Sequence, residues 1–319
     1  MPSESGFPIQ QLPYPAMEGV LEFMNPVEII KFSRVSLKST NIVKRFARSA
    51  WKNRFKLSIF VAYSVSLIFI YDNNRHWIYQ VMRSETSFFQ MDGVESVVFE
   101  DVPRGLMLLT DYISGLLGCH ISHVNITLHP SYDAESVVNW LSAKNRTYEY
   151  CDVVGSASPS KLNQILEKLK VSKRLTISVT TSMNYRMPSN SMGVENLIIR
   201  NGAWVDMDHL TQFEGSAMSV CNSTLSGFEI IGFLQSWQHS KSNFKLKNFE
   251  VTIETDDMLL FAQVLIDANS LLKSTNVRVI YNEEQFMVNG VEFWRIDGKR
   301  AVLYTRAHMG QHILGIFVI

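Results

Sequence analysis

Residues Phe7 to Phe46 read FPIQQLPYPAMEGVLEFMNPVEIIKFSRVSLKSTNIVKRF. This stretch contains three apolar-faced helical patterns that are separated by proline stops. A segment of about 40 residues usually needs a disulfide, a metal or a partner in order to fold. The stretch contains no cysteine and no cluster of metal-ligating residues. The sequence therefore predicts that another protein completes this segment.

Two of the helical patterns have recognisable starts. Leu12 and Pro13 end an extended arm, and a proline in the first turn favours the start of a helix. Asn25 followed by Pro26 and Glu28 has the pattern of a capping box, with asparagine at the N-cap and glutamate placed to reach back. The helix predicted after this cap is apolar nearly all round, which is typical of a helix buried on both sides.

This arrangement resembles the F-box, the segment that docks substrate receptors onto the small adaptor subunit of cullin–RING ubiquitin ligases. F-boxes open with a Leu-Pro pair and continue with helices of this kind. Many carry a tryptophan after the second helix, where this chain has Ser39. The resemblance implies that seven residues lie on or beside the adaptor-facing surface, namely Leu12, Pro13, Val20, Leu21, Met24, Ile29 and Ile30.

Composition is that of an ordinary globular protein. The chain has 319 residues, no formal net charge, 46% hydrophobic residues and 19% charged residues. We predict an F-box module at residues 1–55 and a larger domain at residues 56–319. Three widely spaced cysteines argue against a disulfide framework, and no secretory signal is visible. An intracellular location, cytoplasmic or nuclear or both, is therefore expected.

An uncharged stretch runs from Leu57 to Tyr71. It is shorter than the roughly 20 residues that a helical membrane span needs, and its β-branched and aromatic residues favour strands. The residues after it, from Asp72 to Asn74, are typical of a turn, and His76 to Val81 has the pattern of a returning strand. A β-hairpin is predicted.

Between Lys31 and Lys56 there are nine lysines or arginines and no acidic residue. Most lie opposite an apolar stripe that runs from Ile42 to Trp51. Three interpretations stay open: a solvated helix face, a surface that attracts an acidic protein partner, and a nucleic-acid contact. The last is the weakest, because the sequence contains no module that reads bases.

The larger domain shows a repeating pattern of a short strand, a turn and a helix. Strand patterns begin at Val94, Ile121, Thr147, Arg174 and Val194. The first four recur at about 25 to 27 residues, within the range of leucine-rich-repeat units. Helices are expected at Pro103 to Leu117, at Asp133 to Lys144 and after Ser158-Pro159. The alternation predicts an α/β, leucine-rich-repeat-like stack with a parallel sheet and helices on one side.

The carboxy-terminal third continues this scheme and then changes. Ser226 to Glu229 has the pattern of a capping box, followed by a helix, a strand at Leu246 to Ile253, and a further helix at Met258 to Leu272. Asp297-Gly298 between two alternating runs is a strong hairpin signal. The stack is therefore predicted to end in antiparallel strands.

Two blocks of this region, Phe228 to Ile253 and Trp294 to Tyr304, are similar to the F-box-associated domain that is common in large nematode F-box families. The resemblance implies recognition of a protein substrate and leaves the substrate unknown. Trp204, Trp237 and Trp294 are candidate anchors if they are exposed. For Trp237 a place in the core is the preferred interpretation.

No catalytic constellation emerges, and no enzyme activity, cofactor or metal is predicted. Cys119, His120 and His123 have no spaced partners that complete a metal site, so packed or surface histidines are favoured. The run Asp206 to His209 is interpreted as a cap or loop, and Asp256-Asp257 as the cap of the helix that follows. No phosphate loop or nucleophile elbow occurs. The cysteines are interpreted as small core residues.

The sequence thus predicts a non-catalytic substrate receptor of a cullin–RING ligase, which acts by holding a target near the ubiquitin-charged enzyme. A competing interpretation is a scaffold or nucleic-acid-binding repeat protein whose first helices only cap the stack. A hydrolase that uses His120 or His209 is a more distant alternative.

Overall fold

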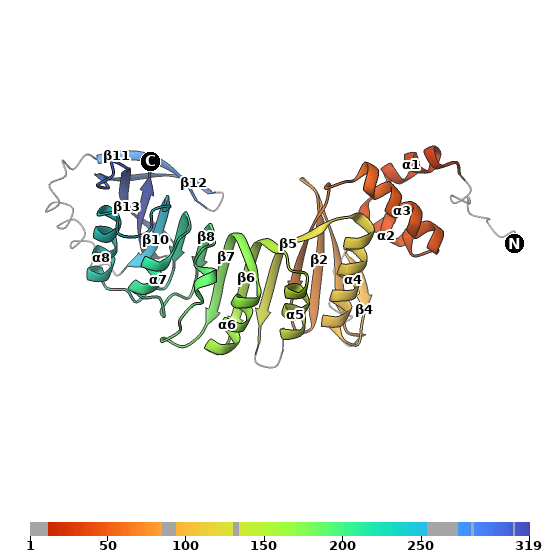
Figure 1. Ribbon diagram of the computed structural model, residues 1–319, viewed down its shortest axis with the longest axis horizontal. Helices are drawn as coiled ribbons and strands as arrows, with labels where there is room; N and C mark the ends of the chain where they lie inside the picture. Colours follow the sequence, from red (N-terminus) through yellow and green to blue (C-terminus); the bar gives the residue numbers. More distant parts are fainter. Residues whose placement is uncertain are drawn as a thin grey trace. The chain divides into compact units, whose positions relative to one another are not determined.

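The computed structural model describes residues 12–73, 75–84, 94–129, 134–253, 274–281, 284–308 and 310–319. The chain forms two compact units (Figure 1). The amino-terminal unit comprises Met1–Thr127 and Ser131–Trp140, and the carboxy-terminal unit comprises Leu128–Pro130 and Leu141–Ile319. Both units combine helices with strands in parallel and antiparallel pairs, so the predicted α/β class is confirmed.

The amino-terminal unit begins with three short helices. These are α1 (Tyr14–Phe23), α2 (Pro26–Ser33) and α3 (Leu37–Ala50). The predicted capping box of α2 is confirmed: the Asn25 side-chain oxygen accepts hydrogen bonds from the backbone N–H groups of Val27 at 2.9 Å and Glu28 at 3.0 Å. The Glu28 carboxylate accepts one from the Asn25 backbone at 2.8 Å. Because these bonds satisfy donors at the start of the helix, they determine where α2 begins.

The strands of this unit are arranged in the order β5-β1-β2-β3-β4. Their bounds are β1 Lys56–Val61, β2 Val65–Tyr71, β3 His76–Met82, β4 Glu95–Val98 and β5 His120–Leu128. β1, β2 and β3 pair antiparallel, whereas β5 is parallel to β1 and β4 is parallel to β3. Helix α4 (Val102–Leu117) contacts β2 and β3. Helix α5 (Glu135–Ala143) crosses the boundary between the units.

The predicted hairpin with a returning strand at His76 is confirmed by the antiparallel pair of β2 and β3. The prediction of a single strand over Leu57 to Tyr71 is wrong. The run contains both β1 and β2, and β3 makes the pair a three-stranded antiparallel meander. The turn between β1 and β2 is held by Ser66, whose hydroxyl bonds to the backbone N–H and C=O of Ala62, each at 3.3 Å. Because Ala62-Tyr63-Ser64 contains none of the glycine, proline, asparagine or aspartate that usually mark turns, composition did not reveal it.

The carboxy-terminal unit contains a row of parallel strands followed by antiparallel strands, in the order β6-β7-β8-β9-β10-β14-β13-β12-β11. The parallel strands are β6 Thr147–Ser156, β7 Lys170–Thr180, β8 Asn196–Ile199, β9 Ala217–Val220 and β10 Asn248–Ile253. The antiparallel strands are β11 Ser274–Tyr281, β12 Glu284–Trp294, β13 Arg300–His308 and β14 Gln311–Val318. The predicted parallel strands at Thr147, Arg174 and Val194 and the closing hairpin at Gly298 are confirmed, whereas β9 and β14 were not predicted. The predicted start of the stack at Val94 is wrong, because β1, β2 and β3 lie between β4 and β5 in the sheet.

The connections between the parallel strands vary in length and type. They contain α6 (Pro159–Lys168), a 3₁₀ turn (Ser189–Ser191), α7 (Met207–Gln212) and α8 (Gly227–Gln238). The predicted caps of α6 and α8 are confirmed, with Ser158 and Ser226 as N-cap residues. Among the described residues the link between β7 and β8 contains no α-helix. The predicted helix at Met258 to Leu272 and its Asp256-Asp257 cap lie outside the described residues.

The core of the carboxy-terminal unit lies where α8 meets the sheet. Phe233 of α8 lies 4.6 Å from Phe249 of β10, measured between ring centroids, and Trp237 lies 5.4 Å from Phe293 of β12. These side chains are almost completely buried. Large aromatic side chains contribute strongly to core stability, so α8 helps to join the parallel and antiparallel parts of the sheet.

Candidate interaction surfaces

Helices α1 to α3 are attached to the rest of the amino-terminal unit by aromatic and polar contacts. The rings of Phe46, Trp51, Phe55 and Trp77 form a series of edge-to-face pairs with centroid distances of 5.1, 5.0 and 5.9 Å. Helix α3 also contacts α4, and the Ser33 hydroxyl lies 2.7 Å from the hydroxyl of Tyr112 in α4. One face of the helices is therefore covered by the chain itself. The predicted domain boundary at residue 55 stays a prediction.

The seven residues that the F-box resemblance assigned to an adaptor-facing surface are distributed over different environments. Leu21, Ile29 and Ile30 are buried, with at most 1% of their surface exposed. Leu12, Val20 and Met24 are partly exposed, and Pro13 is exposed. The three buried side chains stabilise the unit, and a partner could reach them only after a rearrangement.

Three large apolar side chains that the sequence reasoning did not select are exposed at the two ends of α2. Phe23 is the last residue of α1 and is 92% exposed, whereas Val35 and Leu37 flank the N-cap of α3 and are 70% and 78% exposed. We refer to these residues as the exposed trio. A single apolar residue on a surface is ordinary. Three within fifteen residues form an unusual grouping, and Phe23 could have been found because it is out of helical register with the buried Met17 and Leu21.

The basic run is partly used by the unit itself. Lys31 pairs with Glu95 at 2.7 Å, and Arg54 lies 3.7 Å from Asp72. The Arg45 guanidinium lies 4.1 Å from the centroid of the Tyr14 ring. Exposed members of the run include Arg34, Arg48 and Lys52. The basic surface that a partner could reach is thus smaller than the sequence suggested.

His209 has a structural role, which confirms the interpretation of Asp206 to His209 as a cap. Asp206 is the N-cap of α7, and its carboxylate lies 2.6 Å from Nδ1 of His209. Nε2 accepts the backbone N–H of Met187 at 3.3 Å. The ring is 3% exposed and lies 5.2 Å from the Trp204 ring. Burial, assisted by the charge of Arg186, lowers the pKa of His209 from 6.5 to about 4.

The free energy of unfolding is expected to decrease as the pH falls from 6.5 towards 4 because of His209. In this interval the unfolded chain binds a proton at His209 that the folded chain does not bind, so acid favours unfolding. The expected contribution is roughly 1–3 kcal/mol. Urea unfolding at pH 7 and pH 4.5 tests this in the wild type and in His209→Gln. The variant should lose less stability between the two pH values, and an equal loss would contradict the assignment.

The other candidate reactive side chains are not assembled into a site. Cys119 and Cys151 are buried. Burial raises the pKa of the Cys119 thiol to about 12 and also raises the pKa of Cys151. His120 is exposed at the start of β5. Among the described residues, no group of three or more His, Cys, Asp or Glu could hold a metal ion, and none of the helices has the length and apolarity of a membrane span.

Of the three tryptophans proposed as anchors, one is exposed. Trp204 and Trp237 are 4% and 0% exposed, so the preferred core interpretation of Trp237 is confirmed. Trp294 is 44% exposed. Only Trp294 is therefore accessible to a target in this structure.

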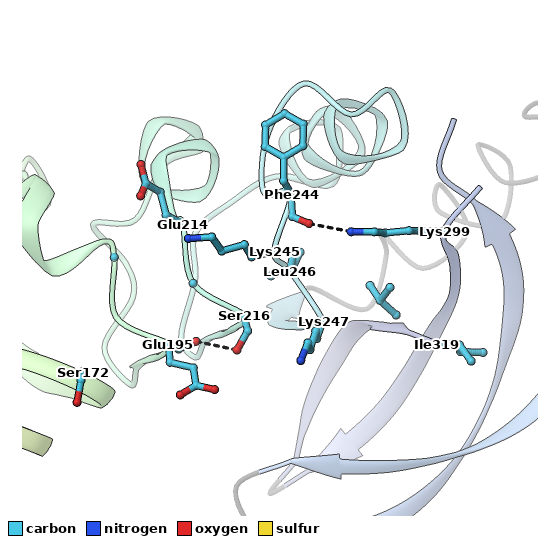
Figure 2. Close-up of a pocket in the computed structure, with 13 residues that line it drawn as sticks. Ser172, Glu195, Glu214, Ser216, Phe244, Lys245, Leu246, Lys247, Lys299 and Ile319 are labelled. Atoms are coloured by element: carbon cyan, nitrogen blue, oxygen red, sulfur yellow. Dashed lines mark hydrogen bonds between the residues drawn. The ribbon is translucent and has the colours of Figure 1, made fainter. Parts of the chain in front are cut away.

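The carboxy-terminal unit contains a pocket of about 700 Å³ at the amino-terminal ends of its parallel strands (Figure 2). Glu195, Ser216 and Lys247 directly precede β8, β9 and β10 and line it. The end of β14 contributes Val318 and Ile319, because β14 is antiparallel to β10. We refer to this cavity as the strand-edge pocket. A second pocket of about 640 Å³ adjoins it and shares four lining residues: Gly193, Glu214, Phe244 and Lys245.

The position of Phe244 at the strand-edge pocket is held through its backbone. Its carbonyl oxygen accepts hydrogen bonds from Lys299 Nζ at 3.2 Å and from Arg295 Nη1 at 3.5 Å. Arg295 is itself held by Asp297, with Nε–Oδ1 and Nη2–Oδ2 distances of 2.9 and 2.5 Å. The hydrogen bond from Arg295 lowers the pKa of Asp297 to about 2. The Phe244 side chain is 59% exposed.

Comparisons with known proteins show a weak similarity to a nematode protein. No protein-family model and no solved structure matches the chain. The Caenorhabditis elegans protein described as "Uncharacterized protein F59B2.9" is 23% identical over 202 residues, which are 61% of this chain. The match spans 47% of that protein, so this chain covers about half of its relative. The relative's name states no function, and the match therefore shows similarity to a nematode protein without assigning an activity.

Proposed function

We propose that this protein is a non-catalytic substrate receptor that docks onto the adaptor subunit of a cullin–RING ubiquitin ligase through α1 to α3. The observation that carries the proposal is the exposed trio on three short helices that resemble an F-box, of which α2 and α3 have side-chain caps. Burial of apolar surface is the main favourable term in most protein association. Solvent-exposed Phe23, Val35 and Leu37 would gain this energy when an adaptor covers them.

The proposed docking surface differs from the one suggested by sequence alone. Leu21, Ile29 and Ile30 hold the helices together from the inside. The contact would instead be made by the exposed trio together with the four accessible residues of the original set, Leu12, Pro13, Val20 and Met24. Exposed basic residues such as Arg34 and Lys52 would speed association with an acidic partner surface.

In this proposal the carboxy-terminal unit holds the target protein. Its strand–helix alternation supports the idea of a leucine-rich-repeat-like stack, because β7, β8 and β9 begin 26 and 21 residues apart, within the roughly 20–29 residues of such repeats. The weak relative comes from a nematode, which is compatible with the resemblance to nematode F-box-associated domains. Ubiquitin transfer would then depend on proximity, with no bond made or broken by this chain.

Replacing Phe23 and Leu37 by aspartate is expected to weaken adaptor binding by roughly 1,000-fold, because buried apolar anchors at interfaces contribute about 2 kcal/mol each. The measurement is a titration of the purified full chain with purified adaptor subunit by isothermal calorimetry. Both positions are exposed, so the variant should keep the thermal unfolding curve of the wild type.

A matched control is Phe244→Asp, which places the same charge at an exposed phenylalanine of the carboxy-terminal unit. It should leave adaptor binding unchanged. Absence of adaptor binding by the wild type at micromolar concentrations would reject the proposed function. Unchanged binding by the double variant would reject the proposed docking surface.

A further inference from the structure

We propose that the strand-edge pocket binds a short peptide segment of a partner protein, with a large apolar side chain between an acidic and a basic residue. This inference rests on the proposed function, since it names the part of the carboxy-terminal unit that would hold the target.

The pocket has two walls of opposite charge. Glu195 and Glu214 project from the loops before β8 and β9, and Lys247 and Lys299 come from the opposite side (Figure 2). A third lysine, Lys245, extends toward Glu214 on the acidic side, so the acidic wall is centred on Glu195. All five side chains belong to exposed residues. Among the described residues no ion pair joins these carboxylates to these ammonium groups. Both walls therefore keep charge that a bound ligand could neutralise.

Apolar surface lies between and beside these walls. The floor includes Leu246, which is buried, and the rim includes Phe244 and Ile319, which are 59% and 51% exposed. In Figure 2 the Phe244 ring points away from Ser216, Lys247 and Ile319, so it lies at the outer edge of this group of residues. Because the Phe244 carbonyl is held by Lys299 and Arg295, little backbone ordering would be needed on binding. Aromatic residues at such places are frequent hot spots of binding.

These features fit a peptide better than a compact small molecule. The volume of about 700 Å³ is enough for a ligand, since small-molecule clefts measure roughly 300–1,000 Å³, and the elongated extent of the surface is what favours a peptide. The adjoining pocket extends the surface past Phe244, as an elongated ligand requires. A peptide can place an apolar side chain on Phe244 and Leu246 while it presents a carboxylate to Lys247 and an ammonium or guanidinium group to Glu195.

The test uses a display library of random 12-residue peptides selected on the full chain. The expected result is a consensus with a large apolar residue between an acidic and a basic residue. For Lys247→Glu, selection should favour a basic residue in place of the acidic one, and for Glu195→Lys the reverse change is expected at the other position. Arg200→Glu, an exposed change just after the far end of β8, should leave the consensus unaltered.

A blocking variant gives a second readout. A side chain at Gly193 would meet no atom within 4 Å of its Cβ, and this residue lines both pockets. The backbone therefore accepts a side chain at this position, and Gly193→Trp, which places an indole at both pockets, should weaken the selected peptides roughly tenfold or more. Failure to select any consensus, or a consensus that Gly193→Trp does not weaken, would overturn the inference.

Adaptor binding measured on the same preparations separates this inference from the proposed function. Peptide binding without adaptor binding would keep the pocket and reject the ligase role. Adaptor binding without peptide selection would keep the docking surface and reject the pocket.

Discussion

Trp237→Ala is expected to lower the free energy of unfolding of the carboxy-terminal unit by about 3–5 kcal/mol. Trp237 is 0% exposed and packs edge to face on Phe293, with the Arg295 guanidinium 5.3 Å from the ring centroid. Removal of the indole would leave a cavity bordered by α8 and β12. It would also remove the apolar cover from Arg295, which helps to hold the β12–β13 hairpin.

Trp294→Ala is the matched control, because Trp294 lies at the end of β12 and is 44% exposed. Its expected effect is within about 0.5 kcal/mol. Unfolding in urea should be followed by far-UV circular dichroism, since both variants lose a fluorescent tryptophan. Amide hydrogen exchange in β10 should accelerate in Trp237→Ala and stay unchanged in the control. Equal effects of the two substitutions would contradict the burial of Trp237.

Arg306→Met is expected to lower the free energy of unfolding by about 3–5 kcal/mol, because it leaves the buried carboxylate of Glu250 without its charged partner. Glu250 of β10 is 2% exposed. It accepts hydrogen bonds from Arg306 Nε and Nη2 at 2.9 and 2.8 Å and from the Tyr304 hydroxyl at 2.8 Å. A carboxylate buried without such partners is strongly unfavourable.

This network crosses a strand. Glu250 and Tyr304 are both paired in register with Gly315 of β14, which lies between β10 and β13. A Cβ at Gly315 would lie 2.2 Å from the Tyr304 ring. Glycine therefore lets the Tyr304 ring lie over β14 and reach Glu250. The network joins the last parallel strand to the antiparallel end of the sheet.

The double variant Arg306→Met with Glu250→Gln tests the cause of the loss. Glutamine removes the buried charge and keeps an oxygen that can accept the Tyr304 hydroxyl. Most of the lost stability should return, as measured by urea unfolding of the single and double variants at pH 7. A double variant as unstable as Arg306→Met would indicate that lost packing of the arginine stem, rather than an unpaired charge, dominates.

The two proposed binding surfaces lie in different compact units. The exposed trio belongs to the amino-terminal unit and the strand-edge pocket to the carboxy-terminal unit. Substitutions at one surface are therefore expected to leave binding at the other unchanged, because the two surfaces are formed by different residues of separate units and sites without shared partners are usually independent. This independence is the property that a receptor for both an adaptor and a target needs.

Local signals in the sequence were sufficient to predict many of the elements. Asn25 with Glu28 and Ser226 with Glu229 predicted the starts of α2 and α8, since capping boxes depend on residues three positions apart. Asp297-Gly298 predicted the hairpin turn because glycine readily adopts the positive φ that such turns need. In the structure the φ of Gly298 is +88°. The regular recurrence of strand patterns along the chain predicted that β6, β7 and β8 are parallel neighbours.

Non-local packing decided the rest. The apolar pattern of α2 identified a helix that must be buried, yet only the contacts of the folded unit show that Ile29 and Ile30 face its own core while Phe23, Val35 and Leu37 stay in solvent. β14 and the strand-edge pocket bring together segments that are about 60 to 150 residues apart in the chain. Helix caps and turns are set by neighbours in sequence, whereas the exposure of a side chain and the charge of a pocket depend on segments that meet only after folding.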